Sequence, residues 1–166
     1  MENLLNKEPV QRVLKVLNDF DESLKIETLT SSARTAKDAA ESLNTEVGSI
    51  VKSLLLRTKS SFLLCLVAGD KRCSLNKIKK LLNEKDVSMA NADQVKEITG
   101  FTIGGVSPVG HLNKIDIFID ESLERFENVF AAAGHSHSIF KINFANLCKI
   151  TNGLVKNISE WESQKL

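Results

Sequence analysis

Apolar residues recur every three or four positions in four short segments, and each segment predicts a helix. The first helix follows Pro9, which suits a first helical turn, and its apolar face consists of Val10, Val13, Leu14 and Leu17. A second helix, capped by Ser32, has a face of small residues that predicts close packing against a sheet: Ala33, Ala36, Ala39, Ala40 and Leu43. Ser74 caps the third, whose inward residues are Leu75, Ile78, Leu81 and Leu82. The fourth has a capping box, Asn91 with Gln94, and ends at Gly100.

Between the helices, other segments have the pattern of β-strands. Residues 49–58 and 62–68 are apolar and partly β-branched, and the polar turn between them predicts a hairpin. Residues 24–27 alternate over a short piece, and KIDIFID (114–120) alternates strictly, with isoleucines on one side and Asp116, Phe118 and Asp120 on the other. Short strands are also expected around 127–132 and 138–142, with a helical turn at 144–148. We therefore predict one α/β (α+β) domain over residues 1–166, with a mixed, mostly antiparallel sheet flanked by helices.

Composition narrows the function classes. With 42% hydrophobic residues in 166, the chain can bury a core, and a net charge of +1 gives no case for wholesale nucleic-acid binding. A local patch is the alternative, and the one basic cluster is either a phosphate contact or a solvated helix face: Lys71, Arg72, Lys77, Lys79 and Lys80. The three cysteines, Cys65, Cys73 and Cys148, argue for a reducing compartment. Because no signal sequence or membrane span is evident, we expect a cytoplasmic protein without a membrane partner.

Lys52 interrupts an aliphatic stripe. It shares a strand face with Ile50, Leu54 and Leu56, where a cation is costly unless a polar or charged group meets it. One interpretation is an edge-strand lysine whose ammonium reaches water. The other is a lysine that reaches into a pocket and holds an anionic or carbonyl oxygen.

The segment TGFTIGGVSPVG (99–110) contains four glycines and one proline. It has neither P-loop nor dinucleotide-binding spacing, so those two phosphate-binding motifs are excluded. It is either a turn between helix and strand or a site at which backbone N–H groups approach a ligand without interference from Cβ atoms.

His135 and His137 lie two positions apart after Gly134, so they share a face in an extended segment. A metal site would need further ligands, and neither a CxxC nor an HExxH motif is present. Hydrogen bonding to a pocket and exposure on a solvated loop are the other interpretations.

Six segments in order resemble the YbaK/prolyl-tRNA-editing-domain family, which includes the EbsC and ProX proteins: SIVKSLLL, FLLCLVAGD, TGFTIGGVSPVG, KIDIFIDESL, VFAAAGHSHSIFKI and NLCKITNG. The resemblance runs from about residue 28 to residue 158. Its most specific marks are a lysine in an I-x-K-[ST]-L strand, here Lys52, and a G-x-x-x-P loop, here Gly104 to Pro108.

The resemblance implies a barrel-like mixed sheet and a trans-acting aminoacyl-tRNA deacylase, which hydrolyses the ester of a mischarged tRNA without a metal or other cofactor. On this resemblance we assign catalysis to Lys52, Gly104 and Gly105, and substrate binding to Ser53, Val106, Ser107 and Pro108. His135 and His137 are further substrate-binding candidates from this chain's own sequence. The implied partners are the acceptor end of the tRNA and, as a second candidate, a prolyl-tRNA synthetase. Because an aminoacyl ester is already activated, orientation and oxyanion stabilisation can supply much of the rate without a strong nucleophile.

The segment 131–134 departs from the cysteine-specific branch of that family. That branch has a Val-Ser-Gly-Gly-like segment where this chain has Ala-Ala-Ala-Gly followed by His135, so His135 or His137 is the candidate replacement for a small polar contact. Alanine, cysteine, serine and threonine esters therefore all stay open as substrates. The alternative function is a non-catalytic module that binds aminoacyl-adenosine or tRNA, or that associates with a synthetase.

Overall fold

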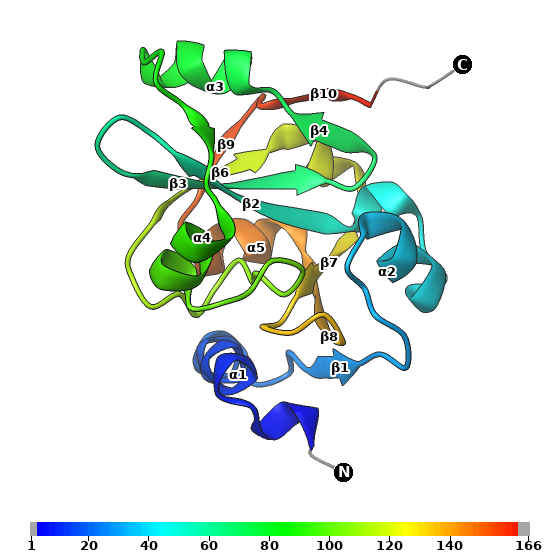
Figure 1. Ribbon diagram of the computed structural model, residues 1–166. Coiled ribbons are helices and arrows are strands. Elements are labelled where there is room, and N and C mark those ends of the chain that lie inside the picture. Colours follow the sequence, from blue (N-terminus) through cyan, green and yellow to red (C-terminus); the bar gives the residue numbers. More distant parts are fainter. Residues whose placement is uncertain (1–2, 163–166) are drawn as a thin grey trace.

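The computed structural model describes residues 3–162. Within this range helices are interspersed with single strands and with runs of two or three strands (Figure 1). The α-helices are α1 (Glu8–Phe20), α2 (Ala36–Leu43), α3 (Leu75–Leu82), α4 (Ala92–Thr99) and α5 (Phe144–Thr151). Three short 3-10 helices accompany them: η1 (Leu4–Asn6), η2 (Val47–Ser49) and η3 (Glu121–Arg125).

The strands form three sheets. The largest has the order β5 (Ser88–Met89), β2 (Val51–Arg57), β3 (Phe62–Ala68), β6 (Asp116–Asp120) and β9 (Leu154–Lys156). The second joins β1 (Ile26–Thr28), β8 (Ser138–Asn143) and β7 (Asn128–Ala132), and the third joins β10 (Ser159–Trp161) and β4 (Lys71–Cys73). All pairs are antiparallel except β3 with β6 and β6 with β9. The predicted fold class is confirmed, although the described strands do not close into a barrel.

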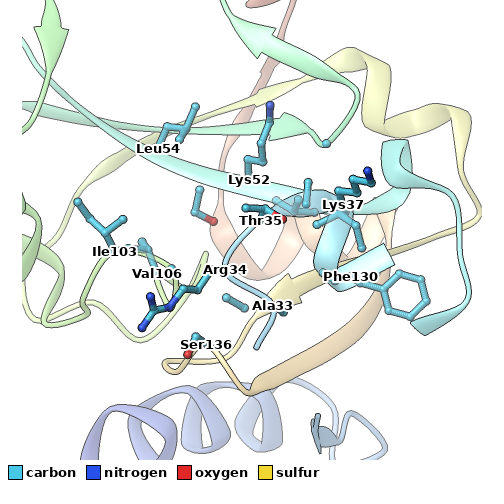
Figure 2. A pocket seen from close by; sticks show the side chains of 18 of the residues that line it. Ala33, Arg34, Thr35, Lys37, Lys52, Leu54, Ile103, Val106, Phe130 and Ser136 are labelled. Carbon is cyan, nitrogen blue, oxygen red and sulfur yellow. The ribbon is translucent and has the colours of Figure 1, made fainter. Parts of the chain in front are cut away.

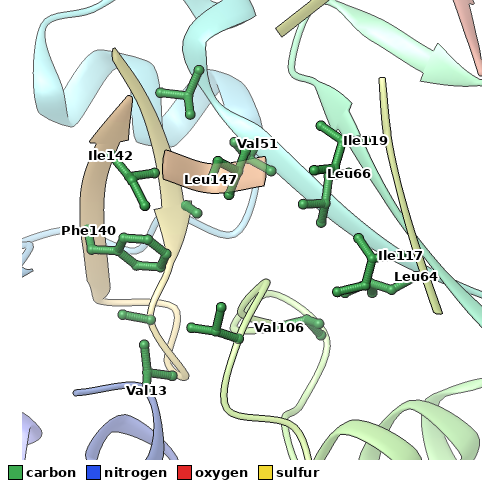
Figure 3. Close-up of a cluster of buried hydrophobic side chains, with 14 of the residues drawn as sticks. Val13, Val51, Leu64, Leu66, Val106, Ile117, Ile119, Phe140, Ile142 and Leu147 are labelled. Atoms are coloured by element: carbon green, nitrogen blue, oxygen red, sulfur yellow. The ribbon is translucent and has the colours of Figure 1, made fainter. Parts of the chain in front are cut away.

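Alternation in β3 and β6 separates two of the three hydrophobic clusters of the described residues. Leu64, Leu66, Ile117 and Ile119 point to one face of the large sheet, where residues from α1, α4, α5, β7 and β8 pack on them (Figure 3). Leu63, Cys65, Val67 and Phe118 lie on the other face, which α3 covers through Ile78. Because β3 is covered on both faces, its sequence is a continuous apolar run.

Local sequence signals explain most element boundaries. The hairpin predicted over 49–68 is confirmed, with Val51 to Arg57 paired to Ala68 to Phe62. The capping box of α4 is confirmed as well, since Asn91 Oδ1 accepts from Gln94 N (2.8 Å) and Gln94 Oε1 accepts from Asn91 N (2.9 Å). Gly100 ends α4 in the left-handed region at φ 78°.

Two predictions from the pattern were wrong. Thr35 rather than Ser32 caps α2, because its Oγ1 accepts from Asp38 N (3.1 Å), so Ala33 lies outside the helix. Leu81 is 45% exposed and faces away from the core. The strand predicted from KIDIFID is confirmed as β6, from Asp116 to Asp120, and the side chain of Asp120 at its end is fully buried.

Candidate functional site

A pocket of about 1080 Å³ opens where the three sheets meet (Figure 2). Its walls come from the segment before α2, from β2, from the glycine-rich segment after α4, from the β7–β8 connection and from the end of β10. The lining is mainly apolar, with charged or hydroxyl side chains at Arg34, Thr35, Lys37, Lys52, Ser53, Asp70, Ser136, Ser138 and Glu162. Such a mixture suits a ligand that is largely enclosed and oriented by a few polar groups.

The edge of β2 is open where it borders the pocket. β5 pairs with β2 only at Leu56 and Arg57, and Ala90 N donates to Leu55 O (3.0 Å). In the described part of the chain, no strand therefore pairs with β2 at Lys52 and Ser53 on that side. An open edge offers backbone N–H and C=O groups to a ligand.

Lys52 and Ser53 leave β2 on opposite faces. The side chain of Lys52 extends away from Val106 (Figure 2), and its ammonium donates to Lys71 O in β4. Glu162 Oε1 lies 3.4 Å from the same Nζ. The Lys52 ammonium, which shares its strand face with aliphatic residues, thus has two polar partners, the Lys71 carbonyl and the Glu162 carboxylate.

Ser53 has a buried Oγ without a hydrogen-bond partner among the described residues. Ser53 lines the pocket, and its strand parity places it on the face of Val51 and Leu55, toward the glycine-rich segment. A buried hydroxyl is normally satisfied, so an unpaired one that borders a pocket marks a position for a ligand atom.

The glycine-rich segment forms a compact loop, with Gly104 and Val106 on the pocket wall. Gly105 N donates to Thr102 O (2.9 Å), which closes a turn. A Cβ on Gly105 would stand 2.9 Å from His135 N and Cα, so only glycine lets the loop approach the β7–β8 connection this closely.

Arg12 of α1 fixes both ends of this loop. Its Nε donates to Gly110 O (2.9 Å), its Nη2 donates to Gly100 O (2.8 Å), and the guanidinium lies 4.7 Å from the ring centroid of Phe101. Sequence analysis missed this contact, because nothing local connects residue 12 with a loop almost ninety residues later.

Ser107 and Pro108, in the same loop, are buried and lie outside the pocket lining. Ser107 Oγ accepts from Val109 N (3.1 Å), and Ser107 O accepts from His111 Nε2 (2.7 Å). Burial is the main reason that the pKa of His111 is lowered, so its ring is neutral. These residues hold the loop in shape.

Only the first of the two histidines, His135, lines the pocket. His135 Nδ1 accepts from His137 N (3.0 Å), which leaves the Nε2 of a neutral ring as a donor. Burial, followed by the charges of His137 and Lys7, lowers the pKa of His135. The His137 ring instead bonds Leu29 O through Nδ1 (3.1 Å). Residues 3–162 contain no group of three or more His, Cys, Asp or Glu side chains arranged to hold a metal ion.

The C-terminal strand supplies a further part of the rim that sequence analysis missed. Trp161 and Glu162 both line the pocket. Near them, Asp70 accepts two hydrogen bonds from Arg125 (2.8 and 3.0 Å), and these bonds lower the pKa of Asp70. The ionised carboxylate is therefore already paired.

The fold and the pocket define an α/β domain with a mainly apolar cavity that a few charged and hydroxyl side chains border. The family model for the aminoacyl-tRNA editing domain matches residues 30–150. The chain belongs to this family. No helix within residues 3–162 is long and apolar enough to cross a membrane.

Relatives among known sequences are of two kinds. The uncharacterised protein YwhH of Bacillus subtilis is 35% identical over 114 residues, which are 68% of this chain and 71% of that protein. A proline–tRNA ligase of Lactobacillus acidophilus is 36% identical over 112 residues, 68% of this chain but only 20% of the ligase. The chain thus spans about a fifth of the length of the ligases that it matches.

Solved structures extend the similarity to almost the whole chain. A protein described as a candidate trans-editing enzyme for prolyl-tRNA synthetase has a TM-score of 0.87 and 35% identity, and the match covers 93% of this chain and 98% of that one. The hypothetical protein APE2540 has a TM-score of 0.84 and 26% identity, with 90% and 99% covered.

Proposed function

We propose that this protein is a trans-acting aminoacyl-tRNA deacylase that removes a small amino acid, such as alanine, cysteine, serine or threonine, from a mischarged tRNA. One observation carries the proposal: the open edge of β2 at Lys52 and Ser53 and the loop residues Gly104 and Val106 line the same pocket. Membership of the editing-domain family and the similarity to proline–tRNA ligases support it.

The reaction needs a water molecule to attack the ester carbonyl, with the C–O bond to the ribose breaking and the proton passing to the ribose oxygen. The developing oxyanion requires donors at a fixed position. We assign this role to the backbone N–H groups of Gly104 and Val106, because Gly105 N is already committed to Thr102 O. Gly105 instead permits the loop to lie against His135.

The side chains around the ester have separate roles in this proposal. The Lys52 ammonium, which two oxygens orient, binds an oxygen of the terminal nucleotide. Ser53 Oγ, which has no partner in the described residues, forms a hydrogen bond with the substrate. His135 Nε2 donates a further hydrogen bond to the substrate. Larger side chains are excluded by volume, which is the principle of a second sieve.

Hydrolysis of tRNAs charged with alanine, cysteine, serine and threonine tests the proposal. We expect release of at least one of these amino acids, and a decrease of about 100-fold in kcat/KM for Lys52→Ala, comparable to the loss of one oxyanion donor. Lys59→Ala is the matched control, because Lys59 is exposed at the tip of the same hairpin and lies outside the pocket lining. Absence of hydrolysis above background by the folded wild-type protein would refute the proposal.

A non-catalytic binding module is the second candidate. Its support is that the Lys52 ammonium already has two partners and that a net charge of +1 gives weak general attraction to tRNA. Titration with a non-hydrolysable aminoacyl-adenosine analogue separates the two functions. Binding of the analogue without turnover of any charged tRNA supports the module.

A further inference from the structure

Trp161 lies on the inner face of the two-stranded sheet, although most of its surface is open. In β10 it shares a face with Ser159, which is buried, whereas Glu160 between them points outward and pairs with Arg72 (2.9 Å). An inward tryptophan is normally packed, yet Trp161 is 61% exposed. The reason is that the space beside it is the pocket, which Trp161 lines.

The strand that carries Trp161 is firmly anchored. Asp120, buried in β6, accepts from Ile158 N (2.9 Å) and from Ser159 Oγ (2.8 Å). Ser74 N donates to Ile158 O (2.8 Å) and Lys77 Nζ donates to Ser159 O (2.5 Å). Figure 1 shows β10 alongside β4 at the top of the molecule. Four hydrogen bonds at Ile158 and Ser159, three and two residues before Trp161, thus fix the strand that carries the indole.

Cations surround this indole. The Lys71 ammonium, directly across the sheet, lies 4.2 Å from its ring centroid, and the Arg125 guanidinium lies 5.3 Å from it. Lys71 O also accepts from Lys52, so the indole and the proposed catalytic lysine are joined through one residue. An exposed aromatic ring beside fixed cations fits a ligand that is both planar and anionic, which is the chemistry of a nucleotide.

We propose that Trp161 is a stacking platform for an unpaired nucleobase of the tRNA 3′ end at the mouth of the pocket, with Lys71 beside the adjoining phosphate. The inference rests on the proposed function, and it adds a substrate-binding residue outside the stretch that the family model matches, residues 30–150. Stacking does not depend on which base is present. This contact would therefore bind the single strand, whereas the pocket would select the amino acid.

Trp161 is the chain's single tryptophan, which makes binding directly observable. The probe is the RNA trinucleotide cytidylyl-cytidylyl-adenosine, and its control is a ribose-phosphate trimer of the same length without bases. We expect saturable quenching of the intrinsic fluorescence by the trinucleotide and none by the abasic trimer. Equal signals from both, or a signal from neither, would overturn the proposal.

Kinetics with charged tRNA supply the second arm. Trp161→Leu keeps an apolar side chain but removes the ring, and it should raise KM about tenfold, equivalent to about 1.4 kcal/mol of stacking. Trp161→Phe keeps a ring and should recover most of the affinity. Leu154→Ala, which removes an exposed apolar side chain outside the pocket lining, is the control and should keep the wild-type KM.

The outcomes of the two arms distinguish this inference from the proposed function. If the wild-type protein hydrolyses charged tRNA and Trp161→Leu has the wild-type KM, the stacking platform is wrong and the deacylase stands. If the trinucleotide quenches and the abasic trimer does not, while no charged tRNA is hydrolysed, the platform stands and the deacylase is wrong.

Discussion

Two of the walls of the pocket are built in different ways. The loop wall, residues 99–110, is held by backbone hydrogen bonds, by Arg12 and by burial of Phe101, Val106 and Val109 in the main core. The strand wall, formed by β2 and the end of β10 around Lys52, is held at its surface by partly exposed side chains, among them Trp161, Glu162 and Lys71 of the neighbouring β4.

This difference means that the loop wall sets the shape of the pocket, whereas the strand wall supplies its charged groups. A change in the loop wall alters packed backbone, so it should cost stability and activity together. A change at the surface of the strand wall alters exposed groups, so it should affect substrate binding and leave the fold almost as stable.

Gly105→Ala should have the largest effect on the loop wall. Its Cβ would stand 2.9 Å from His135 N and Cα, and backbone atoms cannot move aside as a flexible side chain can. We expect about 3 kcal/mol less stability in urea unfolding and deacylation close to background. In the control, Gly153→Ala, the Cβ meets Ile119 Cδ1 at 2.8 Å, a side-chain end away from the pocket lining, so activity should persist. Normal activity of Gly105→Ala would show that the loop is not the rigid wall.

Arg12→Ala should have the next largest effect. It leaves Gly100 O and Gly110 O without their charged donor and removes the guanidinium from Phe101, at a cost of about 2 kcal/mol in urea unfolding. Deacylation should fall mainly in kcat, because the loop loses its fixed position. Arg12→Lys offers a single ammonium in place of two separate donors, so it should restore only part of both quantities. Full restoration by lysine would contradict the two-point attachment.

Much of the fold could be predicted from local signals. The hairpin, the capping box of α4 and the alternation of KIDIFID each need only a few neighbouring residues, and the structure contains all three. The three-residue strands β4, β9 and β10 were missed, since so short a strand is defined by its partner rather than by a pattern. Both Ser32 and Thr35 precede the alanines of α2, and only the three-dimensional structure decides between them.

The site was partly predictable for the same reason. Lys52 interrupts an aliphatic stripe and the loop is rich in glycine, so both attract attention in the sequence, and the structure places them on one pocket. Arg12, Trp161 and the open edge of β2 carry no such local signal. Their positions at the pocket and the loop result from tertiary contacts between distant segments, which the periodicity of the sequence cannot reveal.

Acidification should weaken the loop wall to a smaller extent than either substitution. Burial lowers the pKa of His111 below its ordinary value of 6.5, so near and below pH 6.5 the unfolded chain binds more protons at this residue than the folded one. The stability that the neutral His111 contributes should therefore be fully present above pH 6.5, and it should decline as the pH falls below 6.5. His111→Gln should flatten that decline in urea unfolding series, with a remainder from His135, whose pKa is also lowered. An unchanged pH dependence in His111→Gln would exclude His111 as its source.

Glu162→Gln should have the smallest effect and should act on binding alone. Its carboxylate lies 3.4 Å from Lys52 Nζ, and the Glu162 side chain is 59% exposed, so the pair contributes little to stability. Removing this anion beside the proposed phosphate-binding cations should lower KM for charged tRNA about twofold at low salt, and the advantage should disappear as salt screens the charges. Glu160→Gln, the matched control, makes the same charge change on the outer face of β10, where Glu160 pairs with Arg72. An equal decrease of KM in both variants would assign the effect to net charge, whereas a decrease in Glu162→Gln alone assigns it to the strand wall.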